Sequence, residues 1–431
     1  MKNIVLIFIF CSVQLLGQTL APDGLKTLVN ASFTFAPRLA ELETQSEMQG
    51  QRTQFMSSYL LPSVNAFGTY NYITPVGQIP FPSGPNEVMN IRFQPNNNVN
   101  IGLNASYTIL DFGRAKANID KSKMELASSK LSIESAKNQI AAQVAQTFFT
   151  LAFLQESIRI EDSLITTLDE NFSVTQKRVQ QGDALQLDLM NLQSSIDLEK
   201  NRRLELQSAF EKQTLLLEYI CGKSPAMNEL RLDFKSDDTA EALALLQLSE
   251  SHNPEFALIK SKKEATRLDA FQLERSYLPT LSINAGTGFR NAYQPDIYEM
   301  RYNYAFGFSL NAPLYQGGRS RIQKKINGSL LKLNDLAYDN LQKTTKRDLM
   351  QAQTELASLK NRLANASNMV ENAREAVRVG KVRYTNGTAS HTDYMNAISN
   401  LQRVQLTLVN YTYQLCLTRI EIARLSGNRW W

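Results

Sequence analysis

The chain has 431 residues, of which 43% are hydrophobic, and its 46 basic and 41 acidic side chains leave a formal net charge of +5. This composition excludes a disordered chain and, with 3 cysteines, a disulfide-stapled miniprotein, and the small charge excess gives no electrostatic argument for nucleic-acid binding. The presence of only 2 histidines makes a histidine-rich metal site or a histidine-based catalytic centre hard to build.

The first residues have the pattern of a secretory signal. Lys2 precedes the apolar run 4–10, and a small residue follows before a polar stretch. A signal peptide over 1–17, removed on export, is therefore predicted. A lipoprotein processed at Cys11 is a weaker alternative because Phe10 is too large to precede that cleavage site. A membrane anchor is also weaker because the apolar run is well short of about 20 residues.

The first half of the mature chain, 18–222, combines strand and helix patterns. Its proline-free stretch after Pro95 is rich in Ala, Leu, Gln, Glu and Lys, which is the composition of long helices. The longer of these would span about 100 Å. The stretch 73–97, rich in Pro, Gly and Asn, is interpreted as a long loop. The predicted elements are a helix over 37–61, strands over 63–72 and 99–109, and long helices over 114–181 and 184–221.

The second half, 254–427, repeats the first. The segment 178–191 aligns without a gap with 383–396 at an offset of 205 residues, and a fixed offset of this kind indicates an internal repeat. An equatorial segment, 223–253, joins the two repeats, and 428–431 form a C-terminal tail. The second repeat predicts a helix over 254–278, strands over 280–289 and 302–312, and long helices over 319–386 and 388–426.

None of the four predicted strands carries a charge, and apolar residues alternate with polar ones along them. In 302–312, for example, Tyr302, Tyr304 and Phe306 fall on one face. Strands of about eleven residues, at about 3.3 Å each and tilted, cover the roughly 25 Å apolar band of an outer-membrane protein. A soluble β-sandwich shows the same alternation, but the missing charges and the small number of strands favour lipid.

Four strands cannot close a ring, and an open sheet edge in lipid leaves unpaired amides that cost several kcal/mol each. The strands are therefore expected to be shared between copies of the chain. Two copies give eight strands and three give twelve, and only the larger ring leaves a solvent-filled bore. Together with this ring, the long helices favour a tunnel wall over a solid coiled-coil bundle.

With these features in place, the chain resembles the TolC family of outer-membrane efflux proteins. The resemblance implies an α+β membrane protein: a homotrimer with a twelve-stranded barrel in the outer membrane that continues into an α-helical tunnel through the periplasm. It implies no catalytic chemistry, no cofactor and no resident metal ion. Three motifs carry the resemblance, each present twice and in the same order: Leu61-Pro62 and Leu278-Pro279, Gly113-Arg114 and Gly318-Arg319, and the turns Arg178 to Gly182 and Arg383 to Gly387.

The resemblance also implies a function, that of the passive exit duct of a tripartite efflux or type I secretion system. Its expected partners are outer-membrane lipid, a periplasmic adaptor (membrane fusion) protein, and an inner-membrane pump or ABC exporter. The alternative is an exported coiled-coil adhesin or periplasmic adaptor protein, which would be extracted without detergent. An enzyme is not indicated because the chain contains no nucleophile elbow and no metal-ligand spacing.

The resemblance places the gate of the duct at the two turns between long helices. Gly182 and Gly387 are predicted to take positive φ where the helices reverse. Together with Asp183 and Thr388, they are the expected contacts for the adaptor protein. Tyr384 matches a tyrosine that helps to hold the family's tunnel closed.

Two aspartates, Asp188 and Asp393, match the acidic gate residues of the family by their distance from the turn glycines. Three copies would place six carboxylates around the bore, which would favour cations and bind a blocking metal ion. Asn191 and Asn396 stand where the family often has a second acid, and Ala389 replaces an expected arginine. The simpler alternative for both aspartates is a charge that stabilises a helix N-terminus.

Overall fold

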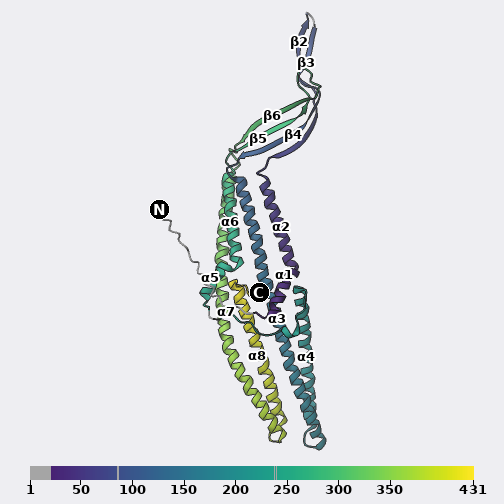
Figure 1. Cartoon of the computed structure of the whole chain (residues 1–431), viewed down its shortest axis with the longest axis vertical. Coiled ribbons are helices and arrows are strands. Elements are labelled where there is room, and N and C mark those ends of the chain that lie inside the picture. The colour runs from purple at the N-terminus through teal and green to yellow at the C-terminus, as the bar shows by residue number, and fades with distance from the viewer. Residues whose placement is uncertain (1–20, 85–86, 237, 239) are drawn as a thin grey trace, which may run out of the picture. The chain divides into compact units, whose positions relative to one another are not determined.

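Figure 1 shows the chain as a computed structural model that describes residues 21–84, 87–236, 238 and 240–431. The predicted signal over 1–17 lies outside the described residues. The elements follow in the order α1 (Asp23–Phe35), α2 (Pro37–Ser58), β1 (Ser63–Tyr72), β2 (Gln78–Gly84), β3 (Glu87–Arg92), β4 (Asn97–Leu110), α3 (Arg114–Gln181), α4 (Gln186–Cys221), the 3-10 turn η1 (Met227–Glu229), α5 (Ala242–His252), α6 (Pro254–Arg275), β5 (Thr280–Arg290), β6 (Arg301–Asn311), α7 (Arg319–Thr385) and α8 (His391–Ser426).

The internal repeat is visible in the bounds of the elements. α3 and α7 begin 205 residues apart, α4 and α8 begin and end 205 residues apart, and α2 and α6 are separated by 217 residues at both ends. The predicted pair of repeats, each with two main strands and long helices, is confirmed. Among the described residues, no helix combines the length and the apolar character that are needed to cross a membrane.

Several predicted ends are wrong by one to three residues. α2 and α6 end earlier than predicted because the residues that follow them form hydrogen-bonded turns, such as the one closed by the Leu278 amide on the Arg275 carbonyl (3.1 Å). α4 and α8 begin later than predicted because Leu185 and Ser390, which precede them, have extended backbone. α7, β4, β5 and β6 differ from the predicted ranges by one or two residues, and α1 and α5 were not predicted.

The chain divides into two compact units, and each takes segments from both repeats. The helical unit contains the described residues up to Glu43, Leu131–Leu258 and Tyr338–Trp431, and the sheet unit contains Thr44–Lys130 and Ile259–Ala337. The sheet unit holds all the strands, and the helical unit holds the two turns between the long helices.

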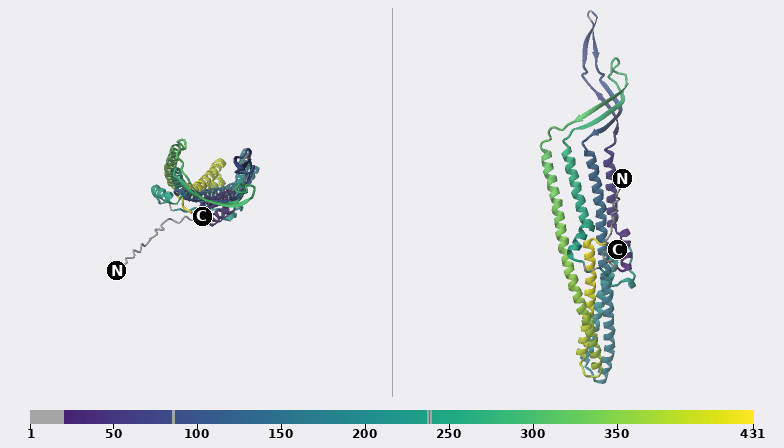
Figure 2. Two further views of the ribbon diagram at one scale, coloured as in Figure 1. Left: turned by 90° about the horizontal axis from the view of Figure 1, so that it is seen from above. Right: turned by 60° about the vertical axis from the view of Figure 1, so that its left-hand side comes forward.

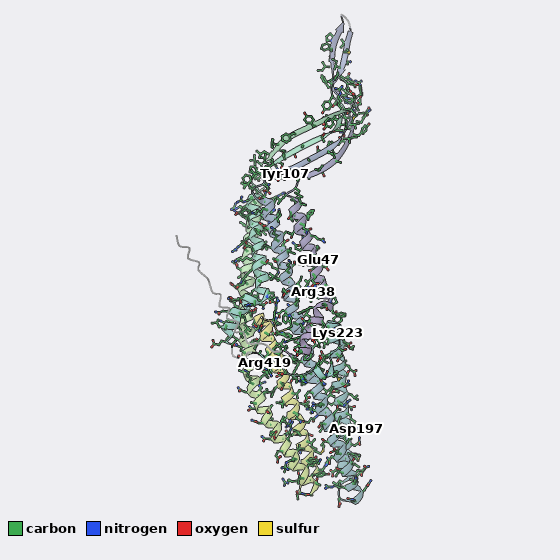
Figure 3. The ribbon with its side chains drawn as sticks, in the orientation of Figure 1. Arg38, Glu47, Tyr107, Asp197, Lys223 and Arg419 are labelled. Carbon is green, nitrogen blue, oxygen red and sulfur yellow. The ribbon has the colours of Figure 1, made fainter. Side chains whose placement is uncertain are left out.

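The main sheet of the sheet unit has the order β1-β4-β5-β6, and every neighbouring pair is antiparallel. The two repeats therefore join at β4 and β5, and β1 and β6 are the edges. Residues that pair across strands share a face. The register pairs Tyr107 (labelled in Figure 3) with Ile283, and Ile283 with Phe308, so the apolar residues lie on one face as predicted. This face is open in the single chain, where Tyr304 is 80% exposed.

The predicted loop over 73–97 is wrong, because β2 and β3 form a two-stranded hairpin there. Prolines argued against a strand, since proline cannot donate to a sheet ladder. In the hairpin, Pro80 pairs with Asn90 and Pro82 with Val88. A proline is compatible with a two-stranded hairpin where its nitrogen faces the outer edge, because no donor is needed there.

Within the sheet unit, segments of four helices lie side by side in the order α2, α3, α6, α7, which is the order of the strands that they adjoin in sequence (Figure 2). α2 and α7 are thus the edges of the helical layer, as β1 and β6 are the edges of the sheet. Side-chain hydrogen bonds join neighbouring helices: Gln49 to Glu125 (2.9 Å), Ser128 to Ser261 (2.8 Å) and Asn334 to Thr266 (3.1 Å).

The core of the helical unit includes an aromatic cluster that the end of the chain helps to build. Trp430, in the predicted tail 428–431, is 3% exposed and packs edge-to-face on Phe234 at 5.7 Å. Arg419 of α8 (Figure 3) fixes the segment between α4 and α5. It donates to the Phe234 carbonyl (2.8 Å) and to both carboxylate oxygens of Asp238 (2.5 and 3.1 Å), which Lys360 also contacts at 2.9 Å.

Candidate functional site

The two turns between long helices have the same construction in both repeats. Gly182, after α3, has φ +84°, and Gly387, after α7, has φ +73°, as predicted. In each turn the next amide bonds back to a carbonyl five residues earlier, Asp183 to Arg178 and Thr388 to Arg383, both at 2.8 Å. Glycine suits these positions because it adopts positive φ without a steric penalty.

The helices that leave the two turns begin differently, although their residues correspond at the offset of 205. At the start of α8, the Ser390 hydroxyl accepts from the Asp393 amide (3.1 Å), and the Asp393 carboxylate accepts from the Ser390 amide (3.2 Å), which forms a capping box. At the start of α4, Leu185 occupies the capping position and offers no hydroxyl. Asp188 therefore has no comparable partner in the turn.

The two predicted gate aspartates thus have different surroundings. Asp393 is exposed, and the hydrogen bonds from the Ser390 side chain and backbone, aided by Arg383, lower the pKa of its carboxyl. Asp188 is half-buried, and its negative charge interacts with the His391 imidazole. Burial lowers the pKa of the His391 imidazole, and the Asp188 carboxylate opposes this shift. Within the described ranges, the buried Nδ1 of His391 has no hydrogen-bond partner.

Tyr384, predicted to help close the tunnel, is buried among the ends of the four long helices. Its hydroxyl lies 3.2 Å from the Thr175 hydroxyl of α3, and its ring stacks on Tyr394 of α8 at 5.5 Å. His391 contacts the same ring at 5.7 Å. Apolar residues of α3, α4 and α8 complete this cluster: Leu164, Leu168, Leu192, Ile196 and Ile398. Tyr384 therefore ties the end of α7 to α3.

A second tie at this point comes from Arg178 of α3, which sequence reasoning missed as a functional side chain. Its Nη2 donates to the carbonyls of Tyr384 (3.3 Å) and Thr385 (3.1 Å), at the C-terminal end of α7. Its guanidinium lies 4.8 Å from the centre of the Tyr384 ring. A cation is favourable here because the last carbonyls of a helix lack partners and carry partial negative charge.

The other predicted site residues lie on the surface of the turns. Asp183 and Thr388 are exposed, and Asn191 and Asn396 are exposed in the first turns of α4 and α8. Large apolar side chains are also exposed beside the first turn: Leu185, Leu187 and Met190. In the part of the chain that the structure describes, no three side chains of His, Cys, Asp or Glu converge to hold a metal ion.

The lateral edges of the sheet unit form a further candidate surface. α7 exposes Ile322, Ile326 and Leu333, which share one face of the helix by their spacing. On the opposite edge of the layer, α2 exposes Met48 and Phe55. Both edges of the helical layer therefore expose apolar side chains, and both edges of the sheet, β1 and β6, are unpaired in the chain.

Comparison with known proteins identifies the family. The model of the outer membrane efflux protein family matches residues 36–223 and 245–428, one match for each repeat. Outer membrane protein OprJ of Pseudomonas aeruginosa is 20% identical over 74% of this chain and 67% of its own length. Outer membrane protein TolC of Salmonella enteritidis is 23% identical over 56% of this chain and 51% of its own length.

Solved structures show the same fold. A structure of CusC superposes with a TM-score of 0.79 at 14% identity, covering 95% of this chain and 93% of its own. The MtrE channel of Neisseria gonorrhoeae superposes with a TM-score of 0.78 at 15% identity, covering 96% and 91%. These matches contradict the alternative of an adhesin or a periplasmic adaptor. Because the family model covers both repeats, the chain belongs to the outer membrane efflux protein family, as an outer-membrane channel of tripartite efflux systems with a periplasmic helical part and no enzymatic role.

Proposed function

We propose that three copies of this chain form one efflux duct by joining head to tail, with β6 of one copy beside β1 of the next. The observation that carries this proposal is that the sheet ends in two unpaired strands. In lipid these edges need partners, because an unpaired amide costs several kcal/mol. Contact between unlike edges generates a ring when the rotation closes. Three copies supply twelve strands and a solvent-filled bore, whereas the eight strands of two copies would be filled by side chains.

The helical layer of the sheet unit supports the same arrangement. Its helices follow the order of the strands, so the rotation that brings β6 to β1 also brings α7 to α2 of the next copy. The exposed residues Ile322, Ile326 and Leu333 of α7 then meet Met48 and Phe55 of α2. Covering these side chains removes apolar surface from water at about 25 cal/mol per Å².

The two turns form the periplasmic gate in this proposal. The bonds from Thr175 and Arg178 to Tyr384 and Thr385 hold the end of α7 against α3, and opening requires their loss. Asp188 and Asp393 of three copies contribute six carboxylates near the opening, and these favour cations. Asn191 and Asn396 keep that opening less charged than a second set of acids would.

The same turns are the proposed docking point for a periplasmic adaptor protein, which links the duct to an inner-membrane pump or ABC exporter. Gly182, Asp183, Gly387 and Thr388 are exposed there. The exposed apolar group beside them, Leu185, Leu187 and Met190, gives an adaptor helix a surface to bury.

Mass measurement and planar-bilayer recording of the detergent-purified protein test the proposal. We expect a trimer that forms cation-preferring pores, and we expect Asp393→Asn and Asp188→Asn to lower the cation-to-anion permeability ratio. Asp197→Asn is the matched control, because it removes the same charge from an exposed position farther along α4 (Figure 3). A stable monomer that needs no detergent would refute the ring, and an equal effect of Asp197→Asn would refute the gate assignment.

A further inference from the structure

A fully buried carboxylate lies in the helical unit, away from the turns. Glu161 of α3 has 0% exposure. The side-chain amide of Gln402, on α8, donates to both of its oxygens at 2.9 Å, and Gln402 is itself buried. A carboxylate this deep is unusual, because burying a charge without full compensation is costly.

A second carboxylate shares the same donor. The Gln402 amide also lies 3.3 Å from Oε2 of Glu199, on α4. An amide nitrogen carries two hydrogens, but three carboxylate oxygens surround this one. With both glutamates ionised, Gln402 alone therefore cannot give each of these oxygens a hydrogen. A proton on Glu161 supplies a further donor at this point.

The positive charges around the pair do not fully neutralise its two carboxylates, which favours binding of a proton. On α4, Arg202 Nε lies 3.4 Å from Glu161, but the Arg202 side chain is 53% exposed, so solvent weakens its attraction. On α8, Arg403 faces the same space and donates to Asn400. On α3, the neighbouring Asp162 is paired with Arg203 of α4. Two carboxylates thus face the guanidinium of Arg202, which is only half withdrawn from water, while that of Arg403 is engaged with Asn400.

A cavity of about 580 Å³ gives water access to the pair. Glu161, Arg202 and Gln402 contribute to its lining, so α3, α4 and α8 all border it. Its walls also include the apolar side chains Phe153 and Leu206. A proton can therefore reach Glu161 without unfolding of the helices.

The second repeat shows that this position does not need acids to pack. At the offset of 205 residues, Ala366 corresponds to Glu161 and Val404 to Glu199. Both are buried, with exposures of 1% and 4%, and Val404 belongs to an apolar cluster between α7 and α8. The fold thus fills the equivalent place with small apolar side chains. The buried Glu161 and the half-buried Glu199 are therefore a special feature of the first repeat rather than a requirement of the fold.

We propose that Glu161 and Glu199 form a proton-binding pair that ties α8 to α3 and α4, so that the packing of these helices tightens at acidic pH and loosens at alkaline pH. The pair links the two repeats, since α3 and α4 belong to the first and α8 to the second. The mechanism requires only a proton from solvent and no other ligand.

The electrostatics agree with this assignment. Burial raises the pKa of the Glu161 carboxyl, Gln402 opposes this effect, Glu199 adds to it, and Arg202 opposes it. The net direction is upward. A carboxyl whose pKa is raised on folding contributes stability that is complete below its unfolded value and is lost as the pH rises through the folded value. The pair therefore destabilises the helical packing on the alkaline side.

Thermal unfolding of the full-length protein in detergent, followed from pH 5 to pH 8.5, tests the proposal. We expect the melting temperature of the wild type to fall over this range and Glu161→Gln to lose most of that fall. Glu199→Gln should move the transition to lower pH, because it removes the neighbouring negative charge. Glu205→Gln, an exposed acid of α4, is the matched control and should keep the wild-type profile.

Infrared difference spectra give a readout that a purely structural role would not change. The wild type should show a protonated-carboxyl band at pH 5 that disappears at pH 8.5, and this band should be lost in Glu161→Gln. Amide hydrogen exchange around Gln402, corrected for intrinsic rates, should rise with pH only in proteins that retain Glu161. A wild-type pH profile in both Glu161→Gln and Glu199→Gln, or the band unchanged in Glu161→Gln, would overturn the proposal. The carboxyl band and the exchange around Gln402 report on this pair and not on trimer formation or the proposed gate.

Discussion

The strongest test of the gate is the replacement of Arg178 by alanine. Arg178 makes two long hydrogen bonds, at 3.3 and 3.1 Å, to carbonyls at the end of α7. We assign about 0.5 kcal/mol to each, at the low end of the usual range. Arg178 is only partly buried, so its stacking on the buried Tyr384 ring adds about 0.5–1 kcal/mol. The closed state should therefore lose about 1.5–2 kcal/mol, which corresponds to a roughly 10- to 30-fold shift toward the open state.

Single-channel recording in planar bilayers measures this shift as the ratio of open to closed time. Arg383→Ala is the matched control, because Arg383 occupies the corresponding place in the second repeat and is exposed. It should change the ratio little. Arg178→Lys should restore part of the closed state, because lysine can donate to a carbonyl but lacks the planar group that stacks on Tyr384.

Two outcomes would refute the reasoning. If Arg178→Ala and Arg383→Ala raise the open time equally, the effect is one of net charge and not of the contact with α7. If Arg178→Ala leaves the open time unchanged while melting at the wild-type temperature, the bonds to Tyr384 and Thr385 do not hold the gate.

Three further predictions concern single contacts. Tyr384→Phe and Thr175→Val each remove the same 3.2 Å hydrogen bond, at about 1 kcal/mol, so each should raise the open time about fivefold and the double variant should raise it no further. Ser390→Ala should speed amide exchange in the first turn of α8 and lower the free energy of unfolding by about 1 kcal/mol. Leu185→Ser should supply the missing cap on α4 and raise the free energy of unfolding by a similar amount. Burial would raise the pKa of Asp238, but hydrogen bonds from Arg419, Ser236 and Lys360 lower it to about 2. Asp238→Asn should therefore lower the free energy of unfolding by about 2 kcal/mol near pH 7. When unfolding is measured at decreasing pH, this difference between variant and wild type should vanish as the pH falls from about 4 through about 2.

The sequence determines the repeats and the strands because both are periodic. Alternation with a period of two puts Ile283 and Phe308 on one face whatever their partners are, and the register agrees. The hairpin of β2 and β3 was not predictable by the same rule. Proline is excluded from a strand only where its nitrogen would have to donate, and the sequence does not say which edge Pro80 faces.

The candidate site was predictable only in its local parts. The positive φ of Gly182 and Gly387 follows from the turn motif, and the capping box of Ser390 and Asp393 could have been identified from their spacing. The contact of Arg178 with α7 joins residues more than two hundred positions apart, so no local pattern contains it. The one signal in the sequence is the arginine that begins each turn motif. That motif predicts the turn but not what the arginine side chain contacts.

The two repeats give the helical unit a symmetric scaffold, and the residues of the proposed gate lie where that symmetry fails. Arg178 reaches across to the end of α7, whereas its counterpart Arg383 stays exposed beside Asp393. Ser390 holds one of the two proposed gate aspartates, Asp393, in a capping box. Leu185 offers no such cap to the other, Asp188, whose charge acts on the His391 imidazole. Duplication alone would make the two turns equivalent. These substitutions instead restrain the turn of the second repeat and leave that of the first less constrained, so a ring of three copies would present three turns of each kind.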